Sequence, residues 1–439
     1  MYAAFLRPHD ERGPPRRDAE DMADTPSAPA QNTAQDTAQD IASDTTAGTT
    51  AVTAEPLAPA PAPAAARRIP LLDVLRGAAI LGTLMTNVWI FAAPGSEWGV
   101  LQGGLDMPER VDAEFVFRFL ADGKFLALLT VLFGVGLAIQ YDSAARRGLP
   151  WPGSYRKRAA FLFLEGTVHF LLVFAWDVLM GYAVAALLTA RLLARSERAR
   201  RIAMWTAIGL HLALVGLVTA GLATSPDEPS RVSDRAVELY AHGSWAEQIA
   251  FRAQNALALR MEPVFSFGLL LFLFLLGVRL HRAGAFTDGP AGRRIRSRLA
   301  AYGLGIGLPL NLAIALAGHD FFLPGRYAAA PLVSLGYIGL IGCVLDRVRV
   351  PAPVTTALSS VGRTALSCYV LQNLLCMLAC YGLGLGLATR WEADARPWWV
   401  MGLWAAVCAV LATGSWLWLR RFTRGPLESV QHRALRART

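Results

Sequence analysis

Apolar residues dominate long stretches of the chain from Ile69 onward, and short polar segments separate these stretches. The apolar runs are about 17–25 residues long, the length a helix needs to cross the hydrocarbon core of a bilayer. Each run is expected to be helical, because unpaired backbone groups are costly in lipid. The pattern predicts an all-α fold, a polytopic transmembrane helical bundle of about ten spans. The approximate spans are 71–92, 118–140, 159–176, 178–195, 202–223, 262–281, 299–317, 327–346, 361–387 and 398–419.

Residues 1–66 have a different composition, rich in Ala, Pro, Thr, Asp and Gln. Such a segment cannot bury enough apolar surface to fold, so a disordered cytoplasmic tail is predicted there. No apolar core follows an early basic cluster, so a cleaved signal peptide is not expected, and Met22 is an alternative start. A membrane domain is predicted over 67–433 and a basic cytoplasmic tail over 434–439.

Basic residues gather in alternate connections between the spans, and the other connections are acidic or mixed. Cytoplasmic loops carry the excess of Arg and Lys, so both termini are predicted to be cytoplasmic. The basic connections include Arg146, Arg198, Arg293 and Arg420. The longest connection on the opposite side, 224–261, contains an amphipathic stretch at 237–259. That stretch either lies on the outer membrane surface or forms a small cap over the bundle.

The chain is 54% hydrophobic and 17% charged, with a formal net charge of +9. Its Arg residues lie in short loops between apolar spans, so the lipid bilayer, and not nucleic acid, is the expected partner. Five cysteines lie within or at the ends of apolar segments, which does not fit a disulfide framework. Three of them, Cys368, Cys376 and Cys380, share a helical face with Gln372. Because no His joins them, a helix contact is predicted there and no metal site.

Ionisable groups inside a bilayer are costly, so each is a hypothesis for a functional site. Asp73 and Arg76 are three residues apart on one helical face. Asn87 follows eleven residues later on the same face. The first two residues can bind a substrate or form a structural ion pair that holds the helix end. Near the outer end of the second span, Asp122 and Lys124 can neutralise each other or contact a ligand.

His169 is the only histidine in the first four predicted spans, and Glu165 lies one turn before it. Asp177 follows in the predicted hairpin, where only Trp176 and Asp177 are expected to join the third and fourth spans. A histidine beside a carboxylate can be a proton shuttle or a general base. The alternative is a hydrogen-bonded packing histidine. In the ninth span, Arg363 lies near the cytoplasmic end and Gln372 lies deeper. The glycines at 382–386 then permit close packing or an unwound segment.

These residues lie in a set of short motifs whose order and spacing resemble the YeiB-like family of bacterial membrane proteins (DUF418). The resemblance covers about 69–433, and implies a bacterial cytoplasmic (inner) membrane protein. One departure is Ser367-Cys368, where the family usually has Thr-Asn before the Tyr. The matching pieces are LDVLRG at 72–77 with Asn87, DGKF at 122–125, LFGVG at 132–136, GTVH at 166–169 with Asp177 and Tyr182, GRTALSCY at 362–369 with Gln372, and RGPLE at 424–428.

The opening is also similar to that of membrane acyltransferases. In the bacterial acyltransferase-three family, an essential His stands where this chain has Asn87. In heparan-alpha-glucosaminide N-acetyltransferases, Asn is usual there and the catalytic His lies in the next outer loop, whereas no His occurs here between Val88 and Val168. Since Asn cannot act as a general base, His169 or an acidic residue such as Glu97 would have to take that role.

Two functions follow as expectations. The first is a secondary transporter or exporter of a small or amphipathic solute, which needs no cofactor; no Walker motif is present. The alternative is a transmembrane acyltransferase that takes an acyl group from a cytoplasmic donor, acyl-CoA, to an outer-face acceptor. A homo-oligomer stays open. The catalytic candidates are His169, Asp177 and Glu165, and the substrate-binding candidates are Asp73, Arg76, Asn87, Asp122, Lys124, Arg363 and Gln372. One polar cavity is predicted to contain Asp73, Arg76, Asn87, Asp122, Lys124, His169 and Asp177.

Overall fold

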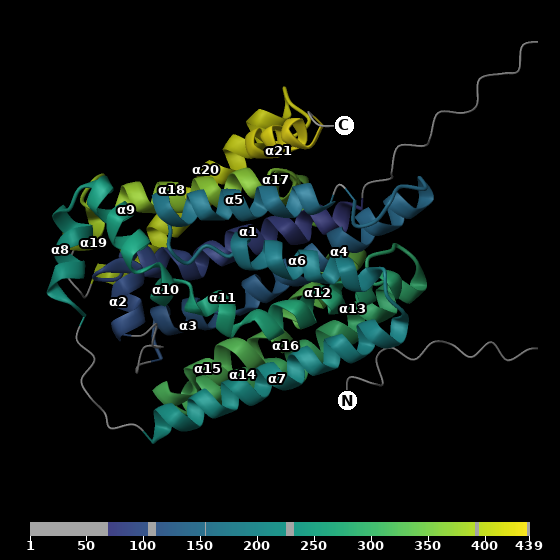
Figure 1. Cartoon of the computed structure of the whole chain (residues 1–439), viewed down its shortest axis with the longest axis horizontal. Helices are drawn as coiled ribbons and strands as arrows, with labels where there is room; N and C mark the ends of the chain where they lie inside the picture. The colour runs from purple at the N-terminus through teal and green to yellow at the C-terminus, as the bar shows by residue number, and fades with distance from the viewer. Residues whose placement is uncertain (1–68, 104–110, 154, 225–231, 391–394, 437–439) are drawn as a thin grey trace, which may run out of the picture. The chain divides into compact units, whose positions relative to one another are not determined.

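The computed structural model describes residues 69–103, 111–153, 155–224, 232–390 and 395–436, and these residues form a bundle of helices with no strand among them (Figure 1). The tail predicted over 1–66 lies outside the described residues. The predicted basic tail at 434–439 overlaps a helix that continues to Arg436, and its last three residues are not described.

The first half of the chain builds most of the core and the connections on one side of it. Its helices are α1 (Pro70–Ala92), α2 (Ser96–Gly103), α3 (Ala113–Ala121), α4 (Lys124–Arg146), α5 (Tyr155–Leu172), α6 (Leu179–Leu193), α7 (Glu197–Ala223), α8 (Asp234–His242), α9 (Trp245–Gln254), α10 (Ala256–Leu259) and α11 (Met261–Phe265).

The second half adds long helices with several local irregularities. They are α12 (Phe267–Arg282), α13 (Pro290–Tyr302), the π-helix η2 (Gly303–Gly307), α14 (Leu308–Leu316), the 3₁₀ turn η3 (His319–Phe321), α15 (Phe322–Pro324), the π-helix η4 (Gly325–Ala329), α16 (Ala330–Arg347), α17 (Ala352–Arg363), α18 (Ala365–Cys380), α19 (Leu387–Arg390), α20 (Arg396–Leu419) and α21 (Pro426–Arg436).

Six helical stretches of the described chain are long and apolar enough to cross a membrane, or seven if the bent pair α17–α18 is one span. The prediction of about ten spans is therefore not supported. The helices α6 and α12 fall short because they have only 15 and 16 residues. In α5, the apolar run is interrupted by four charges, at 156–158 and at Glu165. The six stretches are 70–92, 113–146, 197–223, 290–316, 322–347 and 396–419.

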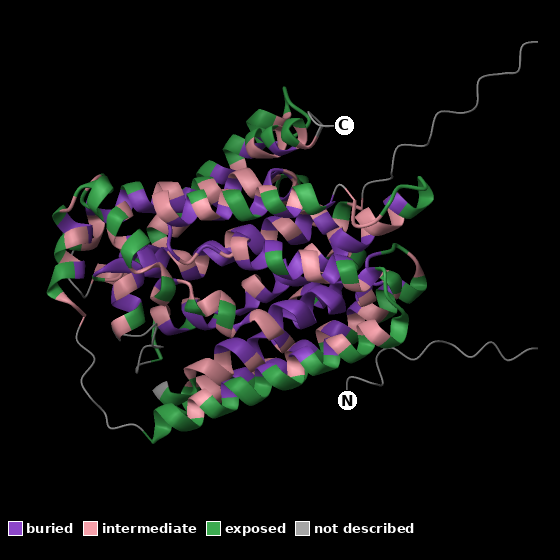
Figure 2. Ribbon diagram, viewed as in Figure 1, coloured by how far each residue is buried: buried purple, intermediate pink, exposed green. Residues whose placement is uncertain are grey.

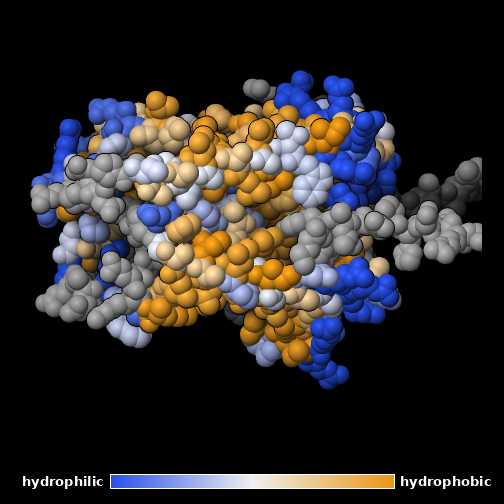
Figure 3. All heavy atoms as spheres, turned by 90° about the horizontal axis from the view of Figure 1, so that it is seen from below, coloured by the Kyte–Doolittle hydropathy of each residue, from blue (hydrophilic) through white to orange (hydrophobic). Residues whose placement is uncertain are grey.

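The helices divide into a buried set and a set that faces outward (Figure 2). The apolar windows of 70–92 and 113–146 are 72% buried, whereas those of 197–223 and 396–419 are only 22% buried. The outward set still carries large apolar side chains, such as Leu210 and Leu217 of α7, at the surface. Figure 3 shows the result on one face, an apolar band between hydrophilic ends. Such a surface is suited to lipid, and the fold is that of a helical membrane protein.

Glycines bring the central helices close together. A Cβ at Gly77 of α1 would stand 1.9 Å from the Leu358 carbonyl oxygen of α17, and one at Gly134 of α4 would stand 2.1 Å from the Phe274 carbonyl oxygen of α12. Small residues let helix backbones approach and gain dispersion energy where lipid removes the hydrophobic driving force. The core at α1, α4 and α12 therefore depends on the absence of side chains at these positions.

Two predicted spans are broken. The second divides into α3 and α4 at Gly123, whose φ of 75° is left-handed. The ninth bends by 91° between α17 and α18, at Thr364. The bend leaves backbone N–H groups without helical partners, and Glu428 of α21 accepts from those of Leu366 and Ser367. A tertiary contact therefore replaces the hydrogen bonds that a straight helix would make.

The connection after α7 forms a cap over one end of the bundle, at the left of Figure 1, where α8 contacts α2 and α9 contacts α5. The buried side chains of α9 are Gln248 and Arg252, whereas Trp245 is 46% exposed. The α9 helix of the cap therefore buries polar side chains, whereas α8 buries Ala236, Tyr240 and Ala241. The opposite end, which we call the arginine end, carries the clusters around Arg146, Arg198, Arg282 and Arg293.

Candidate functional site

The connection from α5 to α6 carries a buried histidine–aspartate pair. His169 lies in the last turn of α5, and Asp177 lies two residues before α6. The His169 Nδ1 and Asp177 Oδ2 atoms are 2.9 Å apart, and the two residues are 3% and 0% exposed. The connection runs over 173–178 and is longer than the predicted two-residue hairpin, because its backbone bonds to groups outside the two helices.

Three groups orient Asp177, one from α6 itself and two from other helices or connections. The Leu179 amide of α6 donates to Oδ1 at 2.9 Å, and the Tyr369 hydroxyl of α18 donates to Oδ2 at 3.2 Å. The Arg260 guanidinium, between α10 and α11, donates to the Asp177 carbonyl oxygen at 2.8 Å. A carboxylate at a helix N-terminus also gains from the helix dipole. The side chain is therefore fixed before any ligand arrives.

The absence of a side chain at Gly166 leaves the space that the Asp177 carboxylate occupies. A Cβ on this residue of α5 would stand 2.6 Å from Asp177 Oδ1 and 2.8 Å from the Met180 amide nitrogen. Any side chain would push the start of α6 away from α5. The glycine three residues before His169 therefore permits the histidine–aspartate contact, which gives a physical role to the GTVH motif.

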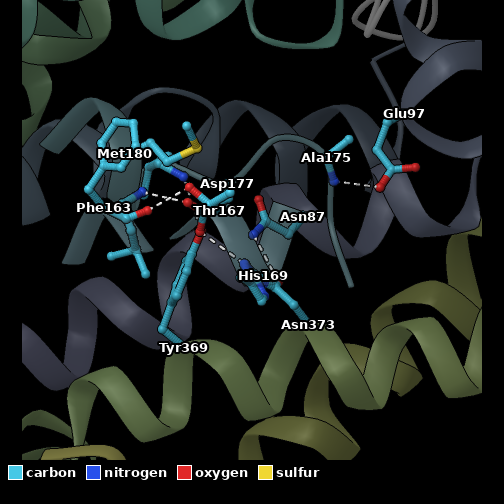
Figure 4. Close-up of polar contacts among 12 residues, drawn as sticks. Asn87, Glu97, Phe163, Thr167, His169, Ala175, Asp177, Met180, Tyr369 and Asn373 are labelled. Atoms are coloured by element: carbon cyan, nitrogen blue, oxygen red, sulfur yellow. Dashed lines mark hydrogen bonds and ion pairs between the residues drawn. The ribbon is translucent and has the colours of Figure 1, made fainter. Parts of the chain in front are cut away.

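A chain of side-chain amides fixes the proton of His169 (Figure 4). Asn87 Nδ2 donates to Asn373 Oδ1 at 3.2 Å, and Asn373 Nδ2 lies 3.4 Å from His169 Nε2. An amide nitrogen only donates, so Nε2 is the acceptor and the ring proton stands on Nδ1, facing Asp177. In this arrangement the Nε2 lone pair is directed at the Asn373 amide, and Nδ1 is directed at Asp177.

The structure thus brings together His169, Asp177 and Asn87 of the predicted residues. Glu165 is not joined to them, and its two carboxylate oxygens have no hydrogen-bond partner among the described residues. Gln372 is fully buried, yet neither of its amide atoms bonds to a described group. The contacts come instead from Tyr369 and Asn373. Their spacing of four residues on a polar helical face was the available signal.

Asp122 and Lys124 belong to a separate cluster at the α3–α4 break. Asp122 accepts from Thr86 at 2.9 Å and lies 3.8 Å from Arg118. Lys124 Nζ donates to the Asp122 carbonyl oxygen at 3.3 Å and lies 4.5 Å from the Phe119 ring centre. No contact links this cluster to His169 in the described part of the chain. The described contacts group Asp122 and Lys124 with Thr86 and Arg118, and the single polar cavity stays a prediction.

A cavity of about 390 Å³ occupies the space between α1, α4, α5, α17, α18 and α21. Of the predicted residues, it is lined by Arg76 and Arg363; Asp73 forms an ion pair with Arg76 at 3.3 Å. Its wall includes Tyr369, the residue whose hydroxyl bonds Asp177, although His169 and Asp177 do not themselves line it. No group of three or more described His, Cys, Asp or Glu residues is arranged to hold a metal ion.

The cap contacts the other side of the α5–α6 connection. Glu97 of α2 accepts from the Ala175 amide at 2.9 Å (Figure 4). It also accepts from the Tyr381 hydroxyl at 3.2 Å. Arg252 of α9 lies 3.7 Å from the same carboxylate. Burial raises the pKa of the Tyr240 phenol in α8, and the Glu97 charge raises it further. Glu97 therefore anchors the α5–α6 connection at Ala175, two residues before Asp177.

These features define a helical membrane protein with a buried histidine site next to an arginine-lined cavity. The family described as "Protein of unknown function (DUF418)" matches residues 280–438. The uncharacterized protein YeiB of Escherichia coli is 30% identical over 81% of this chain and 93% of its own length. The uncharacterized protein YxaH of Bacillus subtilis is 27% identical over 82% and 92%. The chain belongs to the YeiB-like DUF418 family, which confirms the resemblance read from its motifs.

Proposed function

We propose that this protein is a membrane-embedded acyltransferase in which His169 is the general base. The observation that carries the proposal is the chain from Asn87 through Asn373 to His169 and Asp177. It orients the imidazole with Nδ1 toward Asp177 and Nε2 toward Asn373. That arrangement matches what proton abstraction from an acceptor hydroxyl or amine needs.

The proposed step is a displacement at the carbonyl carbon of a thioester donor. His169 Nε2 takes the proton of the acceptor hydroxyl while the hydroxyl oxygen forms a bond to the carbonyl carbon of the thioester. The carbon–sulfur bond then breaks, and the proton on Nε2 passes to the leaving thiolate. Asp177 stabilises the imidazolium that exists between the two proton transfers. Asn373 and Tyr369 are the nearest polar donors to the reacting groups.

The cavity provides a place for the donor. Its middle is apolar, with Leu129, Leu132 and Phe133 of α4 in its wall, and it ends at Tyr369. An acyl chain or an extended thioester arm fits such a wall. The positive-inside rule places the arginine end, and both termini, on the cytoplasmic side of the bacterial inner membrane. The donor then enters from the cytoplasm, and the acceptor comes from the side of the cap.

Proton-coupled secondary transport is the second candidate, and one observation favours it. Glu165 of α5 places two carboxylate oxygens in the protein without a described hydrogen-bond partner. A carboxyl group in such a place is typical of a proton relay in a transporter. We rank this function second because the fixed His169 tautomer is used directly by base catalysis, whereas transport does not require it.

The test compares two buried histidines in purified protein reconstituted into liposomes. Acyl-CoA is supplied on one face, and release of free thiol reports both hydrolysis and transfer. His169→Gln is expected to lower the rate roughly 10²- to 10⁴-fold, the usual contribution of a general base. His211→Gln is the matched control, because His211 of α7 is 2% exposed and its Nε2 lies 3.2 Å from the Tyr327 carbonyl oxygen.

Equal rates in the wild type and in His169→Gln would overturn the acyltransferase proposal. Proton-driven solute uptake that His169→Gln leaves intact and Glu165→Gln abolishes would favour the transporter instead. Supplying acyl-CoA on the face that bears the cap, where no reaction is expected, tests the orientation in the same preparation.

A further inference from the structure

The cations in the cavity wall are contributed by three different helices. Arg76 and Arg158 lie within the first two turns of α1 and α5, and Arg363 is the last residue of α17. The remaining wall is largely aliphatic and aromatic, including Ile80 and Leu162. The cavity is thus amphipathic, with positive charge where these helices start or end and an apolar interior.

The carboxylates present do not neutralise this set. Asp73 pairs with Arg76 at 3.3 Å. Arg158 donates to the neutral Gln140 at 3.3 Å, and Arg363 has a buried Nε without a hydrogen-bond partner. Neither Arg158 nor Arg363 has a carboxylate within 4.0 Å among the described residues, so two guanidinium groups are left for an anion.

Glu428 of α21 also lines the cavity, and both of its carboxylate oxygens accept hydrogen bonds from neutral groups of α18. Its Oε1 accepts from the Leu366 amide at 2.8 Å, and its Oε2 accepts from the Ser367 hydroxyl at 2.5 Å. Both groups belong to the first turn of α18. The carboxylate therefore accepts hydrogen bonds from the first backbone N–H groups of α18, and the described residues show no ion pair between it and the arginines.

We infer that Arg76, Arg158 and Arg363 bind the phosphate of an amphipathic ligand whose apolar arm occupies the cavity toward Tyr369. This assignment rests on the proposed function, since the ligand would be the acyl donor. Guanidinium groups bind phosphate in a planar, bidentate manner, and arginine keeps its charge in an apolar setting. A cation left without an anion beside lipid costs free energy, which a phosphate would recover.

Gly136 of α4 keeps the space beside this site open. A Cβ there would meet only Arg76 NH2, at 3.9 Å, whereas one at Gly134 would meet the Phe274 carbonyl oxygen at 2.1 Å. A large side chain at 136 therefore fills the cavity without separating two helices. This makes Gly136→Leu a steric probe of ligand entry, while the arginine variants probe charge.

Two sources can supply the phosphate, a soluble donor or a lipid headgroup. The experiment measures equilibrium binding to purified protein in nanodiscs of zwitterionic lipid. The probes are coenzyme A, pantetheine, which has the same arm without phosphate, and dioctanoyl phosphatidic acid. Arg158→Gln and Arg363→Gln are each expected to weaken coenzyme A binding about 10- to 100-fold, the value of a hydrogen bond to a charged group. Arg198→Gln, an exposed arginine of the same end, is the control.

The expected pattern is coenzyme A binding that falls with added salt, weak pantetheine binding that the arginine variants leave unchanged, and loss of both in Gly136→Leu. Arginine-dependent binding of phosphatidic acid without coenzyme A would assign the phosphate to a lipid and keep the site. Binding of either phosphate probe that Arg158→Gln and Arg363→Gln leave unchanged, or no binding of either, would overturn the inference. This assay measures binding and not turnover, so a failure of the catalytic proposal is separable from a failure of this one.

Discussion

Two buried aspartates, Asp177 and Asp122, follow the same local pattern and have different surroundings. Both lie next to a helix end and accept a hydrogen bond from a hydroxyl, that of Tyr369 and that of Thr86 respectively. They are 0% and 6% exposed. Apart from Tyr369, the side chain that Asp177 contacts is His169, whose charge can change. Asp122 instead lies beside Arg118, which is permanently positive.

The difference teaches how to separate chemistry from structure in a polar membrane site. A carboxylate beside a histidine can support proton transfer, because the partner can gain and lose a proton near neutral pH. A carboxylate among arginine and lysine side chains mainly compensates fixed charge. The contact from Asp177 through Tyr369 to the cavity adds a route to a ligand, and the described contacts of Asp122 include no such route. We therefore expect substitutions at the two aspartates to fail in different assays.

Asp177→Asn is expected to have the largest effect on the proposed reaction, a loss of roughly 10²- to 10⁴-fold in acyl-CoA turnover. The amide can donate to Nδ1 and so favour the wrong histidine tautomer. Thermal stability in detergent should stay close to that of the wild type, because the amide keeps one oxygen acceptor. Full turnover in this variant would erase the functional distinction between the two aspartates.

Asp122→Asn is expected to act on stability and not on turnover per folded molecule. Removing one partner of a buried ion cluster costs about 3–5 kcal/mol. Lys124 would lose the carboxylate nearest to it in sequence, while Arg118 would keep its ion pair with Glu114 at 3.1 Å. The readout is the melting temperature in detergent together with turnover normalised to folded protein. Lys124→Met in the same background should restore part of the loss; turnover that falls while the melting temperature holds would place Asp122 in the reaction.

Gly166→Ala should give the smallest effect of the three. The new methyl group would stand 2.6 Å from Asp177 Oδ1, and overpacking of this kind costs about 1–3 kcal/mol. Both stability and turnover should fall, because the same contact fixes α6 and the aspartate. Gly209→Ala on α7 is the matched control, since a Cβ there meets nothing within 4 Å. Identical behaviour of the two variants would show that Asp177 does not depend on this close approach.

Helical class, the basic connections and the site motifs were all available in the sequence. Hydrophobic length and the placement of Arg are local properties, so a single chain carries them. The number of spans was not predictable in this way. The helices α6 and α12 are short for a span, and α12 is nevertheless among the most buried helices. Hydropathy reports an apolar surface, but it does not say whether lipid or other helices cover it.

The roles of the two buried histidines were decided only by the tertiary structure. His169 and His211 both lie on apolar helices, yet one meets Asp177 and Asn373, and the other meets a backbone carbonyl and the rings of Phe265 and Tyr327. The 91° bend at Thr364 likewise depends on Glu428, far along the chain. Periodicity identifies the face on which a side chain lies. Whether that side chain can exchange a proton depends on partners from distant helices, because hydrogen bonds and charges act over only a few ångströms in space.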